Sequence, residues 1–325
     1  METFVAPAPK GDDGNDGTHG APVATLSRAI GLGRSVIRIA AGRYRGPLTL
    51  TGTVALRGED GVIVTGGAAN RVMTIAAGAN VVLEGVEVCA TDHAWMAIAV
   101  DAGATATITR CRLTGGSGGG GSPTPILSWG TLHVEGCHLR GGTGDAATGV
   151  CAYGRSTIVD NEIDASHIGV NCGGATVERN RIRAGTYGIY VQGDDVVVRG
   201  NDITLDPDAR NVRAVFVVRG DRLVVEHNTI TGGPDPARWI ALPRRTWTYD
   251  EVSDREYAQA SITVNGLYFH GEADGPSGGP YGGPTQDLDD LLAHDPIRPL
   301  PADVLADIRA FLRGYLDAAA PARHD

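Results

Sequence analysis

A six-residue phrase recurs along the chain and is clearest as IVDNEI at 158–163, VERNRI at 177–182, VRGNDI at 198–203 and VEHNTI at 225–230. Weaker copies read LEGVEV at 83–88, ITRCRL at 108–113, VEGCHL at 134–139 and VNGLYF at 264–269. The copies start between 19 residues (158 to 177) and 39 residues (225 to 264) apart. Spacings of this size predict a solenoid in which each copy belongs to one coil, with loops of variable length between coils.

One slot in the phrase is filled repeatedly by asparagine. Apolar and polar residues alternate around this slot, which indicates strands, and asparagine tolerates the left-handed backbone of a tight bend. We therefore expect a ladder of stacked asparagines, with cysteines as small buried fillers of the same column. The slot holds Val86, Cys111, Cys137, Asn161, Asn180, Asn201, Asn228 and Leu267.

A second apolar segment precedes each phrase, as in GVCAY at 149–153, GVNCG at 169–173 and GIYVQG at 188–193. Each coil then has three short strands, which predicts an all-β, right-handed parallel β-helix over residues 34–274. Residues 1–33 are expected to form a turn and a short helix that caps the open end of the solenoid. Residues 231–260 read as an inserted loop, and 275–325 as a Gly/Pro linker followed by helices.

Composition excludes several classes of protein. The net charge is −10, which argues against a nucleic-acid binder, and no apolar run is long enough for a membrane helix. Lys10 is the only lysine, so a lysine base or Schiff base in the solenoid is excluded. The five cysteines are an odd number and favour reduced, buried thiols.

We expect no cofactor. The carboxylates of the acidic stretch GDDGNDG at 11–17 could bind calcium, but their spacing does not match a calcium loop and a polar turn is favoured. No basic-then-apolar leader begins the sequence, which predicts a cytoplasmic protein, or an extracellular one if the N-terminus has been shortened.

The opening APAPKGDDGNDGTHGAPVATLSRAI, followed by VIRIAAGRYRG, resembles the start of pectate-lyase-like right-handed β-helix proteins. The resemblance extends over about residues 5–270 and implies their fold. It implies no single activity, because that superfamily includes polysaccharide lyases, uronate epimerases, glycoside hydrolases and phage tailspikes. The resemblance also implies that substrate lies along the second strand of each coil.

Alternation along that strand points the scarce aromatic residues outward. An aromatic stripe in a groove suits stacking on sugar rings or on a flat apolar ligand, although loops or a C-terminal helix covering the stripe would give the same pattern. The residues expected to bind substrate are Trp129, Tyr153, Asn171, Tyr187, Gln192 and Phe216, together with His93 and Arg238 from the loops at the rim.

Candidate acid–base residues cluster along the same face. His167 is predicted to lie one coil from Tyr187 and two coils from Arg213. Histidine is the natural base near neutral pH, tyrosine its partner acid, and arginine a clamp for an anion. The predicted catalytic residues are His167, Tyr190, Arg213 and Asp101, with Arg238 as a second candidate clamp.

These residues predict a carbohydrate-active or acid–base enzyme, most simply a lyase or an epimerase that abstracts a proton in an aromatic-lined groove. Many β-helix lyases that this chain resembles use a lysine or arginine beside calcium-binding acids. Here no lysine is available and no cluster of acids lies on the second strand beyond Asp101, so calcium-dependent lysis is disfavoured. No clear carboxylate pair marks a glycosidase. Two alternatives stay open. One is a cytoplasmic enzyme that cyclises or isomerises a small metabolite, and the other is a non-enzymatic glycan-binding or structural solenoid, including a homo-oligomer.

Overall fold

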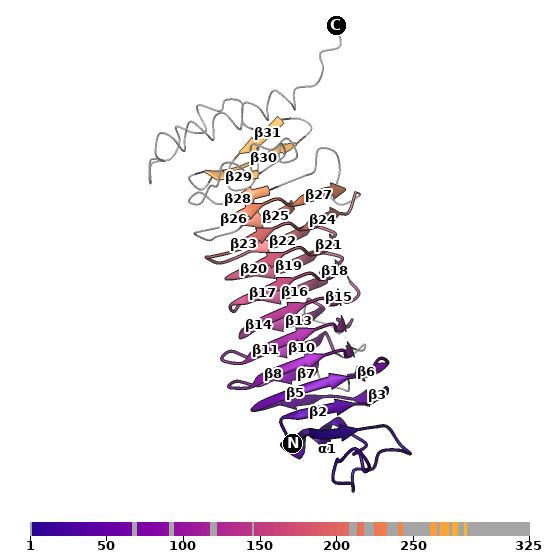
Figure 1. Cartoon of the computed structure of the whole chain (residues 1–325). Coiled ribbons are helices and arrows are strands. Elements are labelled where there is room, and N and C mark those ends of the chain that lie inside the picture. The colour runs from indigo at the N-terminus through magenta and orange to yellow at the C-terminus, as the bar shows by residue number, and fades with distance from the viewer. Residues whose placement is uncertain are drawn as a thin grey trace.

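The computed structural model is a solenoid of parallel strands that rises from the N-terminus in regular coils (Figure 1). It describes residues 2–66, 70–90, 94–117, 122–144, 146–207, 213–217, 224–232, 240–242, 261–264, 267–272, 275–278 and 283–284. Within these residues no helix is long and apolar enough to cross a membrane.

Three sheets, here named A, B and C, run along the solenoid, and each coil between residues 36 and 242 contributes one strand to each. Sheet A contains β1 (Glu2–Val5), β2 (Val36–Ile39), β5 (Thr53–Gly58), β8 (Asn80–Glu84), β11 (Thr105–Thr109), β14 (Thr131–Glu135), β17 (Ser156–Val159), β20 (Ala175–Glu178), β23 (Val197–Arg199) and β26 (Val224–Glu226). Sheet B contains β3 (Gly42–Arg45), β6 (Val62–Thr65), β9 (Glu87–Cys89), β12 (Arg112–Thr114), β15 (His138–Arg140), β18 (Glu162–Ala165), β21 (Arg181–Ala184), β24 (Asp202–Leu205) and β27 (Thr229–Gly232).

Sheet C is formed by the strand that precedes each repeated phrase. It contains β4 (Leu48–Leu50), β7 (Arg71–Ile75), β10 (Met96–Val100), β13 (Thr124–Ser128), β16 (Thr148–Ala152), β19 (Ile168–Cys172), β22 (Tyr187–Val191), β25 (Arg213–Val217), β28 (Ile240–Leu242) and β29 (Ser261–Val264). The three parallel sheets confirm the predicted right-handed parallel β-helix, since parallel crossovers are right-handed.

The asparagine ladder is present in the bend between sheets A and B. The backbone N–H of Asn161 donates to Oδ1 of Asn180 at 3.0 Å, and Asn180 and Asn201 repeat this bond to the next asparagine, ending at Asn228. Each buried side-chain amide therefore satisfies a backbone donor of the preceding coil.

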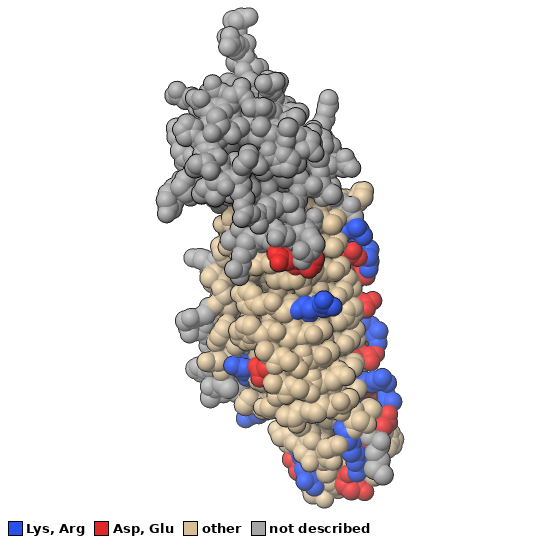
Figure 2. Space-filling model, turned by 90° about the vertical axis from the view of Figure 1, so that its left-hand side faces the viewer, with Lys and Arg blue, Asp and Glu red and all other residues tan. Residues whose placement is uncertain are grey.

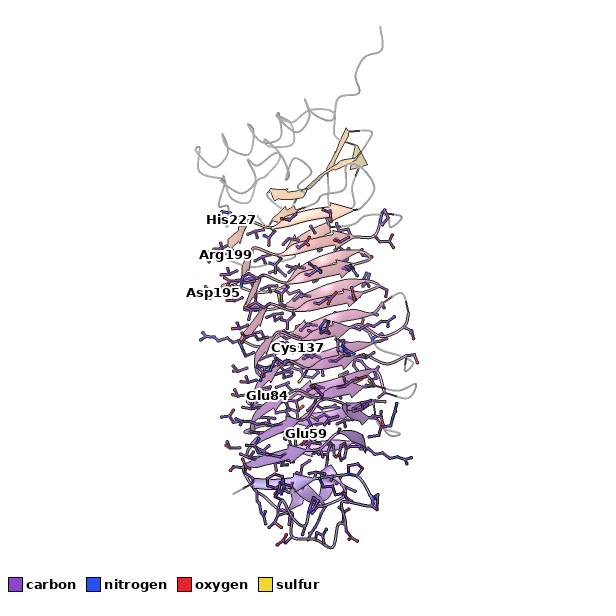
Figure 3. All side chains as sticks on the ribbon, turned by 45° about the vertical axis from the view of Figure 1, so that its right-hand side comes forward. Glu59, Glu84, Cys137, Asp195, Arg199 and His227 are labelled. Carbon is purple, nitrogen blue, oxygen red and sulfur yellow. The ribbon has the colours of Figure 1, made fainter. Side chains whose placement is uncertain are left out.

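Two details of this bend differ from expectation. The left-handed residue is the one before the slot, as at Asp160 and Arg179, because the asparagine side chain must point inward. The cysteines are also more than fillers. Cys137 Sγ accepts the backbone N–H of Cys111 at 3.3 Å, as an asparagine oxygen would, and Cys137 N–H donates to Asn161 Oδ1. Figure 3 shows Cys137 among side chains that stack from coil to coil.

The N-terminal segment caps the first coil, as expected, and also adds a strand to it. Helix α1 (Leu26–Gly31) begins at Thr25, whose hydroxyl accepts the N–H of Arg28, and it buries Leu26. β1 pairs in parallel with β2 and extends sheet A. Residues 1–33 thus contain a strand in addition to the predicted turn and helix. Every second side chain of this strand, β1, is buried.

The last described strands depart from the parallel pattern. VNGLYF at 264–269, expected as a degraded coil, instead joins β29 to β30 (Leu267–Glu272) as an antiparallel pair. The predicted Gly/Pro linker contains β31 (Gly275–Gly278) and β32 (Gly283–Pro284), also antiparallel. The helices predicted after residue 300 and most of the insertion at 231–260 lie outside the described residues.

Candidate functional site

The outward face of sheet C carries the predicted aromatic residues in two rows. Inward positions such as Val150 and Ile189 lie in the core. The first outward row runs through neighbouring coils as Ala99, Leu127, Cys151, Asn171, Tyr190 and Phe216. Residues two positions further along give the second row, which contains Asp101, Trp129, Tyr153 and Gln192.

Trp129 and Tyr153 form an exposed platform on consecutive coils. They are 47% and 43% exposed, and their ring centroids lie 6.4 Å apart at an interplanar angle of 32°. Asn171 Nδ2 donates to the hydroxyl of Tyr153 at 3.4 Å, and Gln192 Nε2 donates to Asn171 Oδ1 at 2.7 Å. We call Trp129, Tyr153, Asn171 and Gln192 the platform. Exposed apolar rings beside ordered amides fit a ligand that is apolar on one face and polar at its edge.

Three aromatic rings pack at the C-terminal end of the platform. Tyr187 lies 5.2 Å from Phe216 in a stacked arrangement and 5.3 Å from Tyr190 edge-on, measured between ring centroids. Tyr190 and Phe216 are 5.2 Å apart. These three rings, the aromatic cluster, are each partly buried. Such mutual packing holds the rings in place before any ligand arrives.

His167 borders the aromatic cluster. Its ring lies 5.6 Å from that of Tyr187, edge to face, and its Nδ1 lies 3.1 Å from the hydroxyl of Thr186. Its carbonyl accepts the N–H groups of Thr186 and Tyr187 at 2.9 and 2.8 Å. Partial burial lowers the pKa of His167 from its usual value of 6.5. The imidazole is therefore neutral at pH 7, the form that accepts a proton.

Arg213 lies beside this group, whereas Asp101 does not. Arg213 pairs with Tyr187 in the strand ladder, so it lies on the strand next to Tyr187, and it is 6% exposed. Asp101 belongs to the coil of β10, three coils from His167, or about 14 Å along the axis at about 4.8 Å per coil. Its carboxylate lies 3.6 Å from Arg71, and the two form an exposed ion pair.

The structure thus brings His167, Tyr187, Tyr190 and Phe216 together, with Arg213 in the adjoining strand. It separates Asp101 from them, because Asp101 lies on the same face but three coils away from His167. His93 and Arg238 lie outside the described residues. Sequence reasoning missed Thr186, although its place directly before Tyr187, one coil from His167, was a usable signal.

Towards the N-terminus, the outward face of sheet C is apolar and buried. Met96, Ala99, Leu127 and Cys151 form a small buried cluster, packed against by Trp95, apart from the main core. Burial raises the pKa of the Cys151 thiol to about 11, so this thiol is protonated at neutral pH. The rings of Trp129 and Tyr153, which are nearby on the same face, stay exposed.

Charge is sparse on the platform. From β13 to β22 none of the outward residues of the described sheet C strands is charged, and Arg71 and Asp101 mark one end while Arg213 marks the other. Elsewhere charges of alternating sign follow the coils. Figure 2 shows one such row along a margin of the solenoid beside a broad face with few charges. Glu84 contacts both Arg57 and Arg110 in this manner.

The fold is a right-handed parallel β-helix. The chain is similar to pectin methylesterase PemA from Erwinia chrysanthemi, with 13% identity over 62% of this chain and 78% of that chain and a TM-score of 0.45. It is also similar to the pectin methylesterase from Aspergillus niger, with 15% identity over 78% and 88% of the two chains and a TM-score of 0.43. The Dettilon tailspike protein shares 15% identity over 74% and 64%, with a TM-score of 0.46. No protein-family model and no curated protein matches the chain.

No group of three or more His, Cys, Asp or Glu residues that would hold a metal ion occurs in the described part of this β-helix. The acids of GDDGNDG instead bind backbone. Asp13 accepts the N–H groups of Ala24 and Thr25, and Asp16 accepts that of Thr18. These bonds hold the pKa of both carboxyls below their usual values, through hydrogen bonds from Thr25 and from Thr18.

Proposed function

We propose that this protein is a carbohydrate-active enzyme that binds a saccharide along the outward face of sheet C. The observation that carries the proposal is the pair of exposed rings on consecutive coils, Trp129 and Tyr153, beside the amides of Asn171 and Gln192. Sugar rings present C–H faces that stack on aromatic rings and hydroxyl edges that bond to amides. The two outward rows of sheet C provide aromatic rings for stacking and amides for hydrogen bonding side by side.

The reaction that these residues support best is proton transfer at a carbon beside a carboxylate. Neutral His167 would remove the proton, and the positive charge of Arg213 would stabilise the enolate that forms. Tyr187, whose ring contacts His167, is a better placed acid than Tyr190. In elimination the electron pair forms a carbon–carbon double bond, and the tyrosine hydroxyl protonates the departing oxygen. In epimerisation the same tyrosine would return a proton to the opposite face.

We expect the uncharged platform and Arg213 beyond its end to determine which sugar of the saccharide binds at each position along sheet C. A neutral or weakly charged part of the saccharide would lie on Trp129 and Tyr153, because no charged outward residue of the described sheet C strands faces it. The acidic sugar that reacts would lie at the His167 end, near Arg213. One tailspike of similar fold is named as a capsular polysaccharide depolymerase.

The test is a turnover assay on uronate-containing and neutral oligosaccharides. Elimination is followed by the ultraviolet absorbance of the new double bond, and epimerisation by NMR of the sugar. We expect His167→Gln to abolish turnover while binding persists, and Trp129→Ala to weaken binding. His133→Gln is the matched control, because His133 is also a partly exposed histidine but lies on sheet A. Binding without turnover on every substrate would make the protein a glycan binder, and the absence of both would overturn the proposal.

A further inference from the structure

A groove lies on the solenoid at the ends of four sheet B strands, β15, β18, β21 and β24. Its volume is about 480 Å³, within the range of small-molecule sites, about 300–1,000 Å³. It is separated from the site on sheet C by the turns that join the two sheets, in which Ser166 lines the groove and His167 borders the aromatic cluster.

The groove is hollow because small residues form its floor. Residues lining it include Gly141, Gly142, Ala165, Ala184 and Gly185. Larger side chains would not fit at two of these positions, since a Cβ on Gly142 or Gly185 would come within 2 Å of a backbone oxygen, at 1.7 and 1.8 Å. The close approach of consecutive coils thus fixes a smooth depression across the strand ends.

Charged side chains of alternating sign line one wall. Arg140, Asp164 and Arg183 are partners in the ladder of β15, β18 and β21, and all point outward. Arg183 Nη1 lies 3.9 Å from Asp164 Oδ1, a long and exposed ion pair. Among the described residues no carboxylate lies within ion-pair distance of Arg140. The wall therefore keeps much of its hydrogen-bonding capacity for a ligand.

These groups match hydroxyls better than they match an anion. Arginine only donates hydrogen bonds and an ionised carboxylate only accepts them, whereas a hydroxyl does both. Vicinal hydroxyls can thus bridge an arginine and the neighbouring aspartate. An anionic ligand would meet Asp164 and Asp206, both of which line the groove. The buried Leu205 and the exposed Pro207 add an apolar wall for the C–H face of a sugar.

We propose that this groove is a second saccharide site, specific for neutral, polyhydroxylated sugars. The proposal is independent of the function assigned to sheet C, because it uses none of the platform residues. The sites lie on either side of one set of turns, so a glycan too long for the platform can contact both faces of the same coils.

The test is binding of D-glucose, D-galactose, maltotriose, galacturonic acid and inorganic phosphate, measured by saturation-transfer NMR and calorimetry. The full chain carrying Trp129→Ala and Tyr153→Ala is used, so that the platform does not contribute. We expect a neutral sugar to bind, and Arg183→Ala to weaken it about tenfold. Arg181→Ala is the matched control, with less than about a twofold effect, since Arg181 is as exposed, lies on the same face of β21 and does not line the groove.

Thermal melts check that each variant is folded, which we expect because the substituted side chains are exposed. Binding of phosphate or galacturonic acid alone would overturn the ligand class. An equal effect of Arg181→Ala and Arg183→Ala, or no binding of any probe, would overturn the site itself. Either failure leaves the proposal for sheet C standing, because that proposal fails only when the intact platform binds no saccharide.

Discussion

His167 and Thr186 lie on consecutive coils, with the imidazole Nδ1 3.1 Å from the threonine hydroxyl. This bond fixes the plane of the ring and occupies Nδ1, which leaves Nε2 for a substrate. The coil spacing of a parallel solenoid places every such pair side by side. Thr186 thus acts as a positioning residue for the proposed base.

The first prediction concerns protonation of His167. Partial burial disfavours the charged imidazolium, so the folded protein binds this proton less tightly than the unfolded chain. NMR titration should give a midpoint below 6.5. The free energy of unfolding should fall as the pH drops through 6.5 towards the folded pKa, and it should be insensitive to this group above that window. The signal is assigned by its loss in His167→Gln, and a midpoint at or above 6.5 would contradict the burial argument.

The second prediction separates positioning from folding at Thr186. Thr186→Val keeps the shape and removes the hydroxyl, so we expect turnover to fall about tenfold, or ~1.4 kcal/mol, with little change in KM. Thr186→Ser should restore most of the rate, since it restores the hydroxyl. A Thr186→Ser variant as slow as Thr186→Val would show that the methyl group, and not the hydrogen bond, matters.

The third prediction concerns the platform. Trp129→Ala and Tyr153→Ala should each weaken saccharide binding about tenfold, ~1.4 kcal/mol, because each removes one stacking surface. Both side chains are more than 40% exposed, so the free energy of unfolding should change by about 0.5 kcal/mol or less. Calorimetry with an oligosaccharide substrate, beside a denaturant melt, measures the two effects. A large loss of stability would mean that the rings are structural.

The sequence was most informative where one chemical requirement repeats in every coil. The asparagine slot repeats because each side chain must satisfy a backbone N–H of the previous coil, so Asn161, Asn180 and Asn201 mark the register directly. The antiparallel pair β29 and β30 was misread, because VNGLYF keeps the alternation of a strand and alternation does not record strand direction.

The site could be predicted only to the level of a face. Period-two alternation placed Trp129, Tyr153 and Tyr190 outward, and counting coils placed His167 near Tyr187. It could not predict which outward residues stay exposed, because Leu127 and Cys151 occupy the same row and are buried by neighbouring elements. Nor could it reveal the groove on sheet B, which exists because small residues coincide at the ends of several strands.

The fourth prediction tests the asparagine ladder. Asn180 Oδ1 accepts from Asn161 N–H, and Asn180 Nδ2 donates to the carbonyl of Ile158 at 2.8 Å. Asn180→Ala leaves both groups buried without these partners, at about 1–3 kcal/mol each, so we expect a loss of about 3 kcal/mol or more. Cys111→Ala, at the end of the same column, should cost about 1 kcal/mol, since its thiol makes only weak hydrogen bonds. Equal losses in urea melts would show that the column contributes by packing alone.

The last prediction concerns the close approach of sheets B and C beside the site. Gly188 lies between Tyr187 and Ile189, and a Cβ there would meet the backbone oxygen of Ala214 and Cγ2 of Ile203, each at 2.5 Å. Gly188→Ala should therefore destabilise the fold by about 1–3 kcal/mol, because the neighbouring coil must move to admit the methyl group. It should also displace Tyr187 from His167 and lower turnover in the protein that remains folded. Gly20→Ala is the control, since nothing lies within 4 Å of its Cβ position. A Gly188→Ala variant as stable as Gly20→Ala would mean that the backbone of the neighbouring coil moves at little cost in free energy. The backbone beneath the aromatic cluster could not then hold its rings rigidly in place.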